Sequence, residues 1–332
     1  MKIIISIILA LTFKCLSVQG QINNSKIIGS WIMINRVYNS GEILPVKLAM
    51  AQTYFRFEFK VNGKAFKAFS PLDNGFIFDF TLSGNNLKIG FINYQLNYLS
   101  SDTLILTEEG PNGFDSTAIK YYFIPERIFQ QKIPVTHDMI IFSGKDSIYI
   151  ENEKFRASFN KDQTFSNFLG SQITYNLNAI SKEYLFMATF IINSDGSIDS
   201  IKIHKSVAGK FDNQFINAVI KSSEYWVPAK NKDKNVSVIR TIVDWNFKSL
   251  KTKELYLNYE NGIISMLLGD YKSAIDSFNL CNESDPKDKD VLYQRGLCYY
   301  RLKDLDKACK DWKKIKDFKS NKEYISVNHL CD

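Results

Sequence analysis

The sequence has few of the residues from which catalytic and metal sites are usually built. It contains only three histidines, His137, His204 and His329, and no two of them are spaced to share one face of a helix. The phosphate-binding glycine loop, the dinucleotide fingerprint, the HExxH zinc helix and the GxSxG nucleophile elbow are all missing. The carboxylates are numerous, but no two stand out in an apolar setting as an acid and a base. The sequence therefore predicts a protein that is not an enzyme and that has no catalytic residues, no cofactor and no metal.

Basic residues are in slight excess but are not concentrated anywhere along the chain. The formal net charge is +7, and no stripe of lysines and arginines interrupts the pattern. Nucleic-acid binding usually requires such a stripe, so a nucleic-acid partner is not expected.

The first twenty residues have the pattern of a secretory signal. Lys2 precedes an apolar run from Ile3 to Phe13, and small residues lead up to Gly20. The run is shorter than the roughly 20 apolar residues that a membrane-spanning helix needs. Lys14 stands where a lipid-attachment motif around Cys15 would have a small residue. We therefore expect residues 1–20 to be removed, and the protein to be exported to the periplasm or cell envelope.

Residues 26–125 alternate between apolar and polar side chains in about eight short runs. Asn-Gly and Gly-Asn pairs, which favour tight hairpin turns, separate several of these runs. The pattern predicts an antiparallel β-barrel or sandwich. With Gly29-x-Trp31 at the start of the first run, the region resembles the lipocalin-like domains of exported bacterial proteins. The resemblance implies that Trp31 closes one end of a barrel holding a small apolar ligand, while a barrel filled by its own side chains is the alternative.

Residues 126–165 connect this region to the next. They contain two or three further candidate strands, which either complete the barrel or begin the following domain.

Residues 166–248 change to an α+β pattern. A long hairpin turns at Asp195-Gly196, and a helix and a closing strand follow. "NSDGSID" is rich in oxygen ligands, but a calcium loop of the EF-hand type needs twelve residues between helices, and here strands flank it. We expect His204, on the second strand of the hairpin, to be a half-exposed sheet residue.

Several motifs give this region a resemblance to the TonB C-terminal domain family. These are "SDG" between hydrophobic strands, Trp226-x-Pro228-Ala229 after the helix, and a final strand that ends at Phe247. The resemblance implies that the domain captures an extended segment of an outer-membrane protein along a sheet edge. Backbone hydrogen bonds then provide affinity and alternate side chains provide selectivity. We expect Trp226 and Pro228 to anchor the core, and Val236–Phe247 to be the binding edge, with candidate contacts at Val236, Val238, Arg240, Ile242 and Asp244.

Residues 254–332 become helical and repeat with a period of 34. The equivalent pairs are Tyr259 and Tyr293, Gly262 and Gly296, Leu268 and Leu302, Asp270 and Asp304, Ala274 and Ala308, and Phe278 and Trp312. The region resembles two tetratricopeptide repeats followed by a capping helix near 322–330. Because about three repeats are usually needed for an independent solenoid, we expect these two to pack on the neighbouring domain.

The repeat also predicts which cysteines pair. Cys309 and Cys331 lie at similar distances from the turn between their antiparallel segments, so they come side by side. Cys281 and Cys298 lie at unequal distances from the turn that joins their two helices, so they are not expected to pair. The sequence therefore predicts a Cys309–Cys331 disulfide and two buried free thiols.

The predicted function is that of a non-enzymatic exported envelope protein, which binds envelope or outer-membrane proteins or peptides through the sheet edge and the repeats. One alternative is a TonB-type energy transducer. That class keeps a membrane anchor and a proline-rich spacer, whereas this chain has the pattern of a cleavable signal and only seven prolines. The other alternative is a carrier of a small apolar ligand in the barrel.

Overall fold

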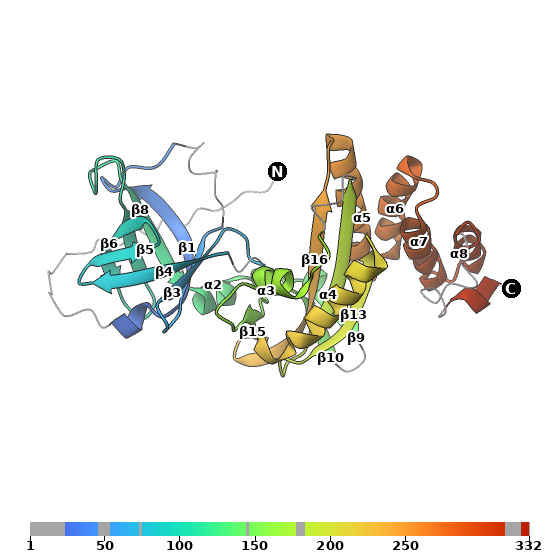
Figure 1. The fold of residues 1–332 in the computed structure, drawn as a ribbon, viewed down its shortest axis with the longest axis horizontal. Coiled ribbons are helices and arrows are strands. Elements are labelled where there is room, and N and C mark those ends of the chain that lie inside the picture. The colour runs from blue at the N-terminus through green and yellow to red at the C-terminus, as the bar shows by residue number, and fades with distance from the viewer. Residues whose placement is uncertain are drawn as a thin grey trace.

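The protein consists of a β-barrel, a mixed sheet with helices, and a set of helical hairpins, arranged in that order along its longest axis (Figure 1). The computed structural model describes residues 24–45, 54–72, 75–143, 146–176, 183–315 and 327–331. The predicted signal at 1–20 lies outside the described residues. Within them, none of the helices combines the length and the apolar character needed to cross a membrane.

The barrel confirms the strand runs predicted from the alternation. Its strands are β1 (Gly29–Tyr38), β2 (Arg56–Phe59), β3 (Lys64–Ala68), β4 (Phe76–Ser83), β5 (Asn86–Ile89), β6 (Ile92–Leu99), β7 (Leu104–Glu108) and β8 (Ile119–Pro125). Each strand pairs with the next, and β8 returns to β1, which closes an antiparallel barrel compatible with a lipocalin-like one. A 3-10 helix, η1 (Asn24–Ile27), precedes β1, and the Trp31 indole donates a 2.8 Å hydrogen bond to the carbonyl of Ile27.

Aromatic side chains fill the inside of the barrel. Phe57 and Phe123 are fully buried, with ring centroids 5.6 Å apart, and Tyr94 lies 5.8 Å from Phe57. Leu104 and Leu106 of β7 complete this cluster. Of the two alternatives for the interior, this packing favours a barrel filled by its own residues.

The connecting residues join the second sheet. After α2 (Glu126–Lys132) and η2 (His137–Met139), the chain forms β9 (Ile140–Ser143) and β10 (Asp146–Ile150). The sheet has the order β13-β12-β16-β10-β9, in which β10 runs parallel to β16 and the other neighbours are antiparallel. The two candidate strands therefore begin the second part of the molecule.

The rest of this part packs on the sheet in the predicted order. Its elements are β11 (Ser158–Phe159), α3 (Phe165–Gln172), β12 (Tyr184–Ile192), β13 (Ile198–Lys205), α4 (Gly209–Lys221), η4 (Ser223–Tyr225), β14 (Trp226–Val227), β15 (Ala229–Asn231) and β16 (Lys234–Asn246). Alternate residues of β12 point to opposite faces. Phe186 and Phe190 pack in the core that also contains α3 and α4, whereas Leu185 and Met187 pack against the C-terminal helices.

The hairpin between β12 and β13 turns at Asp195-Gly196. The Asp195 carboxylate accepts hydrogen bonds from both the amide and the hydroxyl of Ser197, and Gly196 has φ +90°. A Cβ on Gly196 would lie only 2.6 Å from the carbonyl oxygen of Trp226. Glycine is needed here both for the left-handed backbone and for the contact with the Trp226 segment.

Two helical hairpins follow, and equivalent positions 34 residues apart make equivalent contacts. The helices are α5 (Leu250–Leu267), α6 (Tyr271–Ser284), α7 (Lys289–Arg301) and α8 (Leu305–Trp312). Gly262 lies against the Phe278 ring, and Gly296 lies against the Trp312 indole. The predicted capping helix falls mostly outside the described residues, and only η6 (Asn328–Cys331) is seen there.

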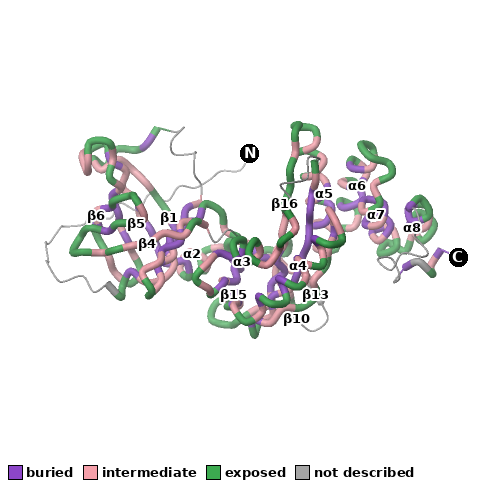
Figure 2. Tube along the Cα trace, in the orientation of Figure 1, coloured by how far each residue is buried: buried purple, intermediate pink, exposed green. Residues whose placement is uncertain are grey.

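The helical hairpins share a core with the sheet, as the small number of repeats predicts. Leu185 and Met187 of β12 pack with Tyr259, Ile263 and other apolar residues of α5 to α7. The Tyr259 hydroxyl donates to the carbonyl of His204. The Lys205 ammonium pairs with Asp288, which caps the N-terminus of α7, and with Asp290 of α7. Figure 2 shows that buried residues continue from the sheet strands into these helices.

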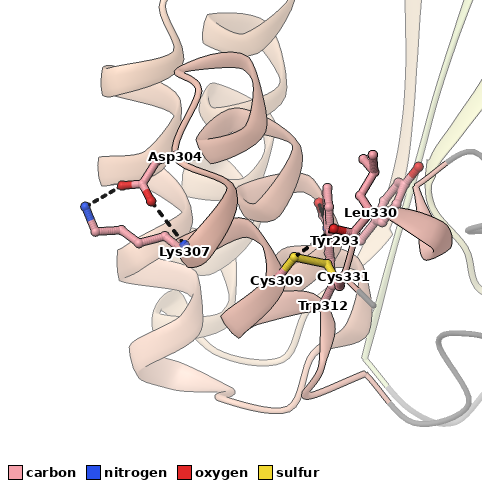
Figure 3. Close-up of a disulfide and its surroundings, with 7 residues drawn as sticks. All are labelled: Tyr293, Asp304, Lys307, Cys309, Trp312, Leu330 and Cys331. Carbon is pink, nitrogen blue, oxygen red and sulfur yellow. Dashed lines mark hydrogen bonds and ion pairs between the residues drawn. A yellow bond between two sulfur atoms is a disulfide. The ribbon is translucent and has the colours of Figure 1, made fainter.

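A disulfide fastens the C-terminal segment to α8 (Figure 3). It joins Cys309 and Cys331 with an S–S distance of 2.06 Å, and the Trp312 indole beside it donates to the carbonyl of Tyr293. Cys281 and Cys298 are free and buried, and burial raises the pKa of each thiol to about 12.

The disulfide can be tested by counting thiols. In a chain produced from Gln21 onward and purified without reductant, titration under denaturing conditions is expected to find the two free thiols of Cys281 and Cys298. A count of four would show that Cys309 and Cys331 are not paired.

Because the helices approach closely at the two equivalent glycines, substitution by alanine should destabilise the protein at both positions. Gly262→Ala and Gly296→Ala are each expected to lower the free energy of unfolding by about 1–3 kcal/mol, because the new methyl group overlaps an aromatic ring. Gly170→Ala in α3 is the matched control, since its Cβ would meet no atom within 4 Å. It should be neutral or stabilising by about 0.5–1 kcal/mol. Urea denaturation measures all three, and equal effects at the three sites would contradict the described packing.

Candidate functional site

Strand β16 is covered along one side but only partly along the other. Strand β12 pairs with it from Val238 to Asn246, and β15 pairs with Lys234–Val236. On the opposite side, β10 pairs only with Ser237–Ile239, where the Glu151 amide donates a 3.0 Å bond to the carbonyl of Ile239. The interpretation of the whole of Val236–Phe247 as an open edge is therefore wrong for its first half.

The second half of β16 is an open edge. Backbone groups of successive strand residues point alternately to the two sides, so those of Thr241 and Val243 face the same side as those of Ile239. Within the described residues, no backbone group pairs with Thr241 or Val243 on that side. The backbone N–H and C=O groups of Thr241 and Val243 are thus available to pair with an added strand.

The open edge begins at a buried ion pair. The Arg240 guanidinium donates to both oxygens of the Glu151 carboxylate, with Nη2 2.6 Å from Oε1. Glu151 also accepts a 2.9 Å bond from the Ala157 amide, and the guanidinium lies 4.5 Å from the centroid of the Trp226 ring. After Glu151 the chain turns away from the sheet around Asn152. The side-chain oxygen of Asn152 accepts hydrogen bonds from the amides of Lys154 and Phe155. Arg240 is therefore a structural residue, and the expectation that it contacts a partner is not supported.

A groove borders the open edge on the α3 and α4 side of the sheet. It has a volume of about 590 Å³, and its lining includes Ile242 and Asp244 of β16. The other lining residues are Ser166, Leu169, Gly170, Ile173, Thr174, Tyr175, Asn176, Tyr184, Phe186, Phe211, Phe215 and Val243. Asp244 is the only charged residue in this lining, and burial raises the pKa of its carboxyl.

An apolar patch borders the same edge on the α5 side. Trp245 is 50% exposed, and Leu257 of α5 is 48% exposed. Both line a shallow depression that also includes Val243 and Phe247. The open edge of β16 thus lies between a groove of mixed polarity on one face of the sheet and a mainly apolar depression on the other.

The structure divides the five predicted contact residues into two groups. Val236, Val238 and Arg240 are covered by β15, β10 or the ion pair, whereas Ile242 and Asp244 lie on the groove. Trp226 is buried in the core, as expected for an anchor. The exposed Trp245 lies within the predicted edge but was not among the predicted contacts, and Leu257 of α5 was not predicted at all.

His204 lies away from this site and is more buried than predicted. It is 2% exposed, and its Nε2 is 2.8 Å from the hydroxyl of Thr189. Burial, and secondarily the nearby charge of Lys202, lowers the pKa of His204 to about 3. The expectation of a half-exposed histidine is wrong because α5 and α7 cover this face of the sheet.

A second buried ion cluster holds the barrel to the sheet. Arg156 donates to both oxygens of Glu126 at 2.7 Å, and Arg56 of β2 lies 3.8 Å from the same carboxylate. Burial alone would raise the pKa of Glu126, but the two arginines outweigh it and lower the pKa to about 2. The cluster connects the barrel, α2 and the segment that leads into β11.

No protein-family model matches this chain, and no significant match was found among curated proteins. Among the described residues, no group of three histidine, cysteine, aspartate or glutamate side chains is placed to hold a metal ion. The open edge of β16 and its two bordering surfaces are therefore the features that bear on function.

The ion pair at the start of the edge can be tested by removing one or both partners. Glu151→Gln is expected to lower the free energy of unfolding by about 3–5 kcal/mol, because it leaves the buried Arg240 charge without its counter-ion. The double variant Glu151→Leu/Arg240→Met removes both charges and should recover most of that loss. Urea denaturation measures the free energy of unfolding of both variants. If Glu151→Gln is as stable as the parent, the buried ion pair is contradicted.

Proposed function

We propose that this chain is a non-enzymatic, exported envelope protein that captures an extended segment of another protein by adding it as a strand to β16. The observation that carries the proposal is the open edge at Thr241 and Val243, which lies between the groove beside α3 and α4 and the apolar depression at Trp245 and Leu257. An unpaired strand edge is a template for another strand, and soluble proteins usually cover or charge it. Here the edge is left free beside a groove, which is the arrangement that β-augmentation requires.

The dimensions of the edge set the length of the captured segment. Pairing would begin after Ile239, where β10 leaves the sheet, and would end at Asn246, the last residue of β16. This stretch has the length of seven strand residues, so at about 3.3 Å per residue a segment of about seven residues covers it.

The two borders set its side-chain pattern. Alternate residues of an added strand point to opposite faces. One set would enter the groove beside α3 and α4, and the other would lie on Trp245 and Leu257. Because the groove lining mixes apolar and polar side chains and Asp244 is its single charge, the segment should be amphipathic on this face, with one basic residue near Asp244. On the face toward Trp245 and Leu257 it should be apolar.

The family resemblances support the same reading. Residues 166–248 resemble the TonB C-terminal domain family, which captures extended segments of outer-membrane proteins. Residues 254–332 resemble tetratricopeptide repeats, which bind peptides on helical surfaces. The predicted export signal directs the chain to the compartment where envelope and outer-membrane proteins would be its partners.

Neither alternative function is favoured by a specific observation. The aromatic core around Phe57 and Phe123 occupies the barrel interior that an apolar ligand would need. An energy transducer would retain its N-terminal anchor, so sequencing the mature N-terminus separates the two classes: a retained Met1 favours transduction, and Gln21 excludes it.

Site-specific cross-linking tests the proposed edge. A photoreactive amino acid at Thr241, in the native envelope, is expected to cross-link a partner protein. The same probe at Ser237 is the matched control, because Ser237 points its backbone to the same side but is covered by β10. Equal cross-linking from both positions, or none from Thr241, would contradict strand addition at this edge.

A backbone substitution tests whether hydrogen bonds make the contact. Val243→Pro removes an amide that faces the open side and is expected to reduce Thr241 cross-linking about tenfold or more, while the sheet remains folded. Asp244→Pro removes an amide that faces β12 instead and should unfold the domain. If Val243→Pro folds and cross-links as well as the parent, partner binding does not use this strand edge.

A further inference from the structure

The two helical hairpins allow equivalent positions to be compared, because each residue of α5 has a counterpart in α7 34 positions later. On one face of α7, Val291 is 2% exposed and Arg295 is 7% exposed. Helix α6 covers this face: Val291 packs in the same core as Cys281 of α6. The Arg295 guanidinium donates a 2.9 Å hydrogen bond to the side-chain oxygen of Asn279, also in α6. The neighbouring helix therefore supplies both an apolar and a polar contact.

The same face of α5 is not covered by an earlier hairpin. Among the described elements, the one before α5 is the strand β16. The counterpart of Val291 is Leu257, which is 48% exposed. The counterpart of Arg295 is Asn261, which is also exposed. With two exposed residues one and two turns earlier, they form a row at helical spacing that we call the α5 stacking face, which consists of Leu250, Glu254, Leu257 and Asn261.

The opposite end of the hairpin array has a cap made from the chain itself. Val327 and Leu330 of the C-terminal segment pack with Trp312 of α8, and the disulfide fastens this segment in place. Repeat arrays usually end in such a cap or in a polar outer surface. At the α5 stacking face the described residues provide no such cap, and Leu250 is 82% exposed. The N-terminal end of the array is therefore the end at which a further element can stack.

The α5 stacking face adjoins the open edge of β16. The depression that contains Trp245 also contains Leu257, with Lys253 and Glu260 on the same side of α5. Helix α5 covers the face of the sheet that carries Val243, which packs in their shared core. A strand added at the open edge would turn one row of side chains toward this side. That row stays exposed unless the helix layer is extended as well, because a sheet buries its face only against a second layer.

We propose that the captured segment is joined in its own protein to an amphipathic helix, and that this helix packs on the α5 stacking face as α6 packs on α7. Given the strand addition at β16, on which this rests, the partner contributes a strand–helix unit. The unit extends the sheet by one strand and the helix layer by one helix. The added strand is then covered on the α5 side, and the exposed leucines of the stacking face are removed from water.

The contact between α6 and α7 indicates the chemistry of the partner helix. Opposite Leu257 it should carry an apolar side chain, as α6 does opposite Val291. Opposite Asn261 it should carry a polar side chain, as α6 offers Asn279 to Arg295. The carboxylate in the middle of the face favours a basic residue across from it. At 1.5 Å per residue the stacking face is about 17 Å long, so a helix of about three turns covers it.

Cross-linking from the stacking face tests this arrangement. A photoreactive amino acid at Asn261, in the native envelope, is expected to cross-link the same partner protein as the probe at Thr241. Mapping by mass spectrometry should place the two cross-linked sites within roughly 30 residues of each other, because packed neighbouring elements are usually joined by short connections. Leu280 of α6 is the matched control. It is 49% exposed but lies on the helix face opposite to the buried Phe278, so it should not cross-link.

The outcomes separate the helix contact from strand addition itself. Cross-linking from Thr241 but not from Asn261 would overturn the helix contact and leave strand addition intact. Cross-linking from neither position would contradict strand addition, and the helix contact with it. Equal cross-linking from Asn261 and Leu280, or two sites far apart in the partner, would overturn the helix contact.

A charge on the stacking face provides a second readout. Leu250→Glu places a carboxylate among the apolar contacts of the partner helix and is expected to lower Thr241 cross-linking about threefold or more. Leu250 is the first residue of α5, where a negative charge suits the helix dipole, so the variant should fold as the parent does. Leu280→Glu is the control and should change nothing. Unchanged Thr241 cross-linking in a Leu250→Glu variant that is folded by circular dichroism would overturn the proposal.

Discussion

The buried ion pair between Glu151 and Arg240 is the interaction on which the arrangement of the sheet depends. It lies where β10 stops pairing with β16, and it turns the chain from Glu151 toward Ala157 and β11. Burying two charges is expensive, so a pair of this kind contributes more to defining one arrangement than to net stability. Here the arrangement that it defines is that of β16, whose side toward β10 is paired over the first half of the strand and unpaired over the second.

Contacts spread from this pair through the core. The guanidinium lies over Trp226, and the carbonyl of Trp226 lies so close to Gly196 that no side chain fits at the hairpin turn. Trp226 and Phe159 pack in turn against Phe165 at the start of α3. Helix α3 is therefore fixed at the side of the groove that borders the open edge.

The barrel and the helical hairpins are attached to this sheet by two different kinds of contact. The barrel is held by the charged cluster of Arg56, Glu126 and Arg156, whereas the helices share an apolar core with Leu185 and Met187. The first kind is specific but contributes little net energy, and the second removes apolar surface from water. The helical hairpins are thus an integral part of the sheet's core, as their small number of repeats requires.

Much of the fold could be predicted because its signals are local. Alternation and Asn-Gly turns gave the eight barrel strands, and the 34-residue period located Gly262 and Gly296 against their aromatic partners. The covered half of β16 could not be predicted, because it depends on three residues of β10 that lie about ninety positions earlier in the chain. For the same reason Arg240 was expected at the surface, where unpaired arginines usually lie, and His204 was expected to be half-exposed. Their burial is decided by distant segments that leave no local pattern.

The most direct test of the half-open strand is residue-resolved amide hydrogen exchange of the free protein by NMR. We predict that the amides of Thr241 and Val243 exchange much faster than those of Ile242 and Ile239, because only the first two face the open side. Protection of Thr241 and Val243 equal to that of Ile239 would show that the edge is already covered, and would contradict the proposed capture of a partner strand.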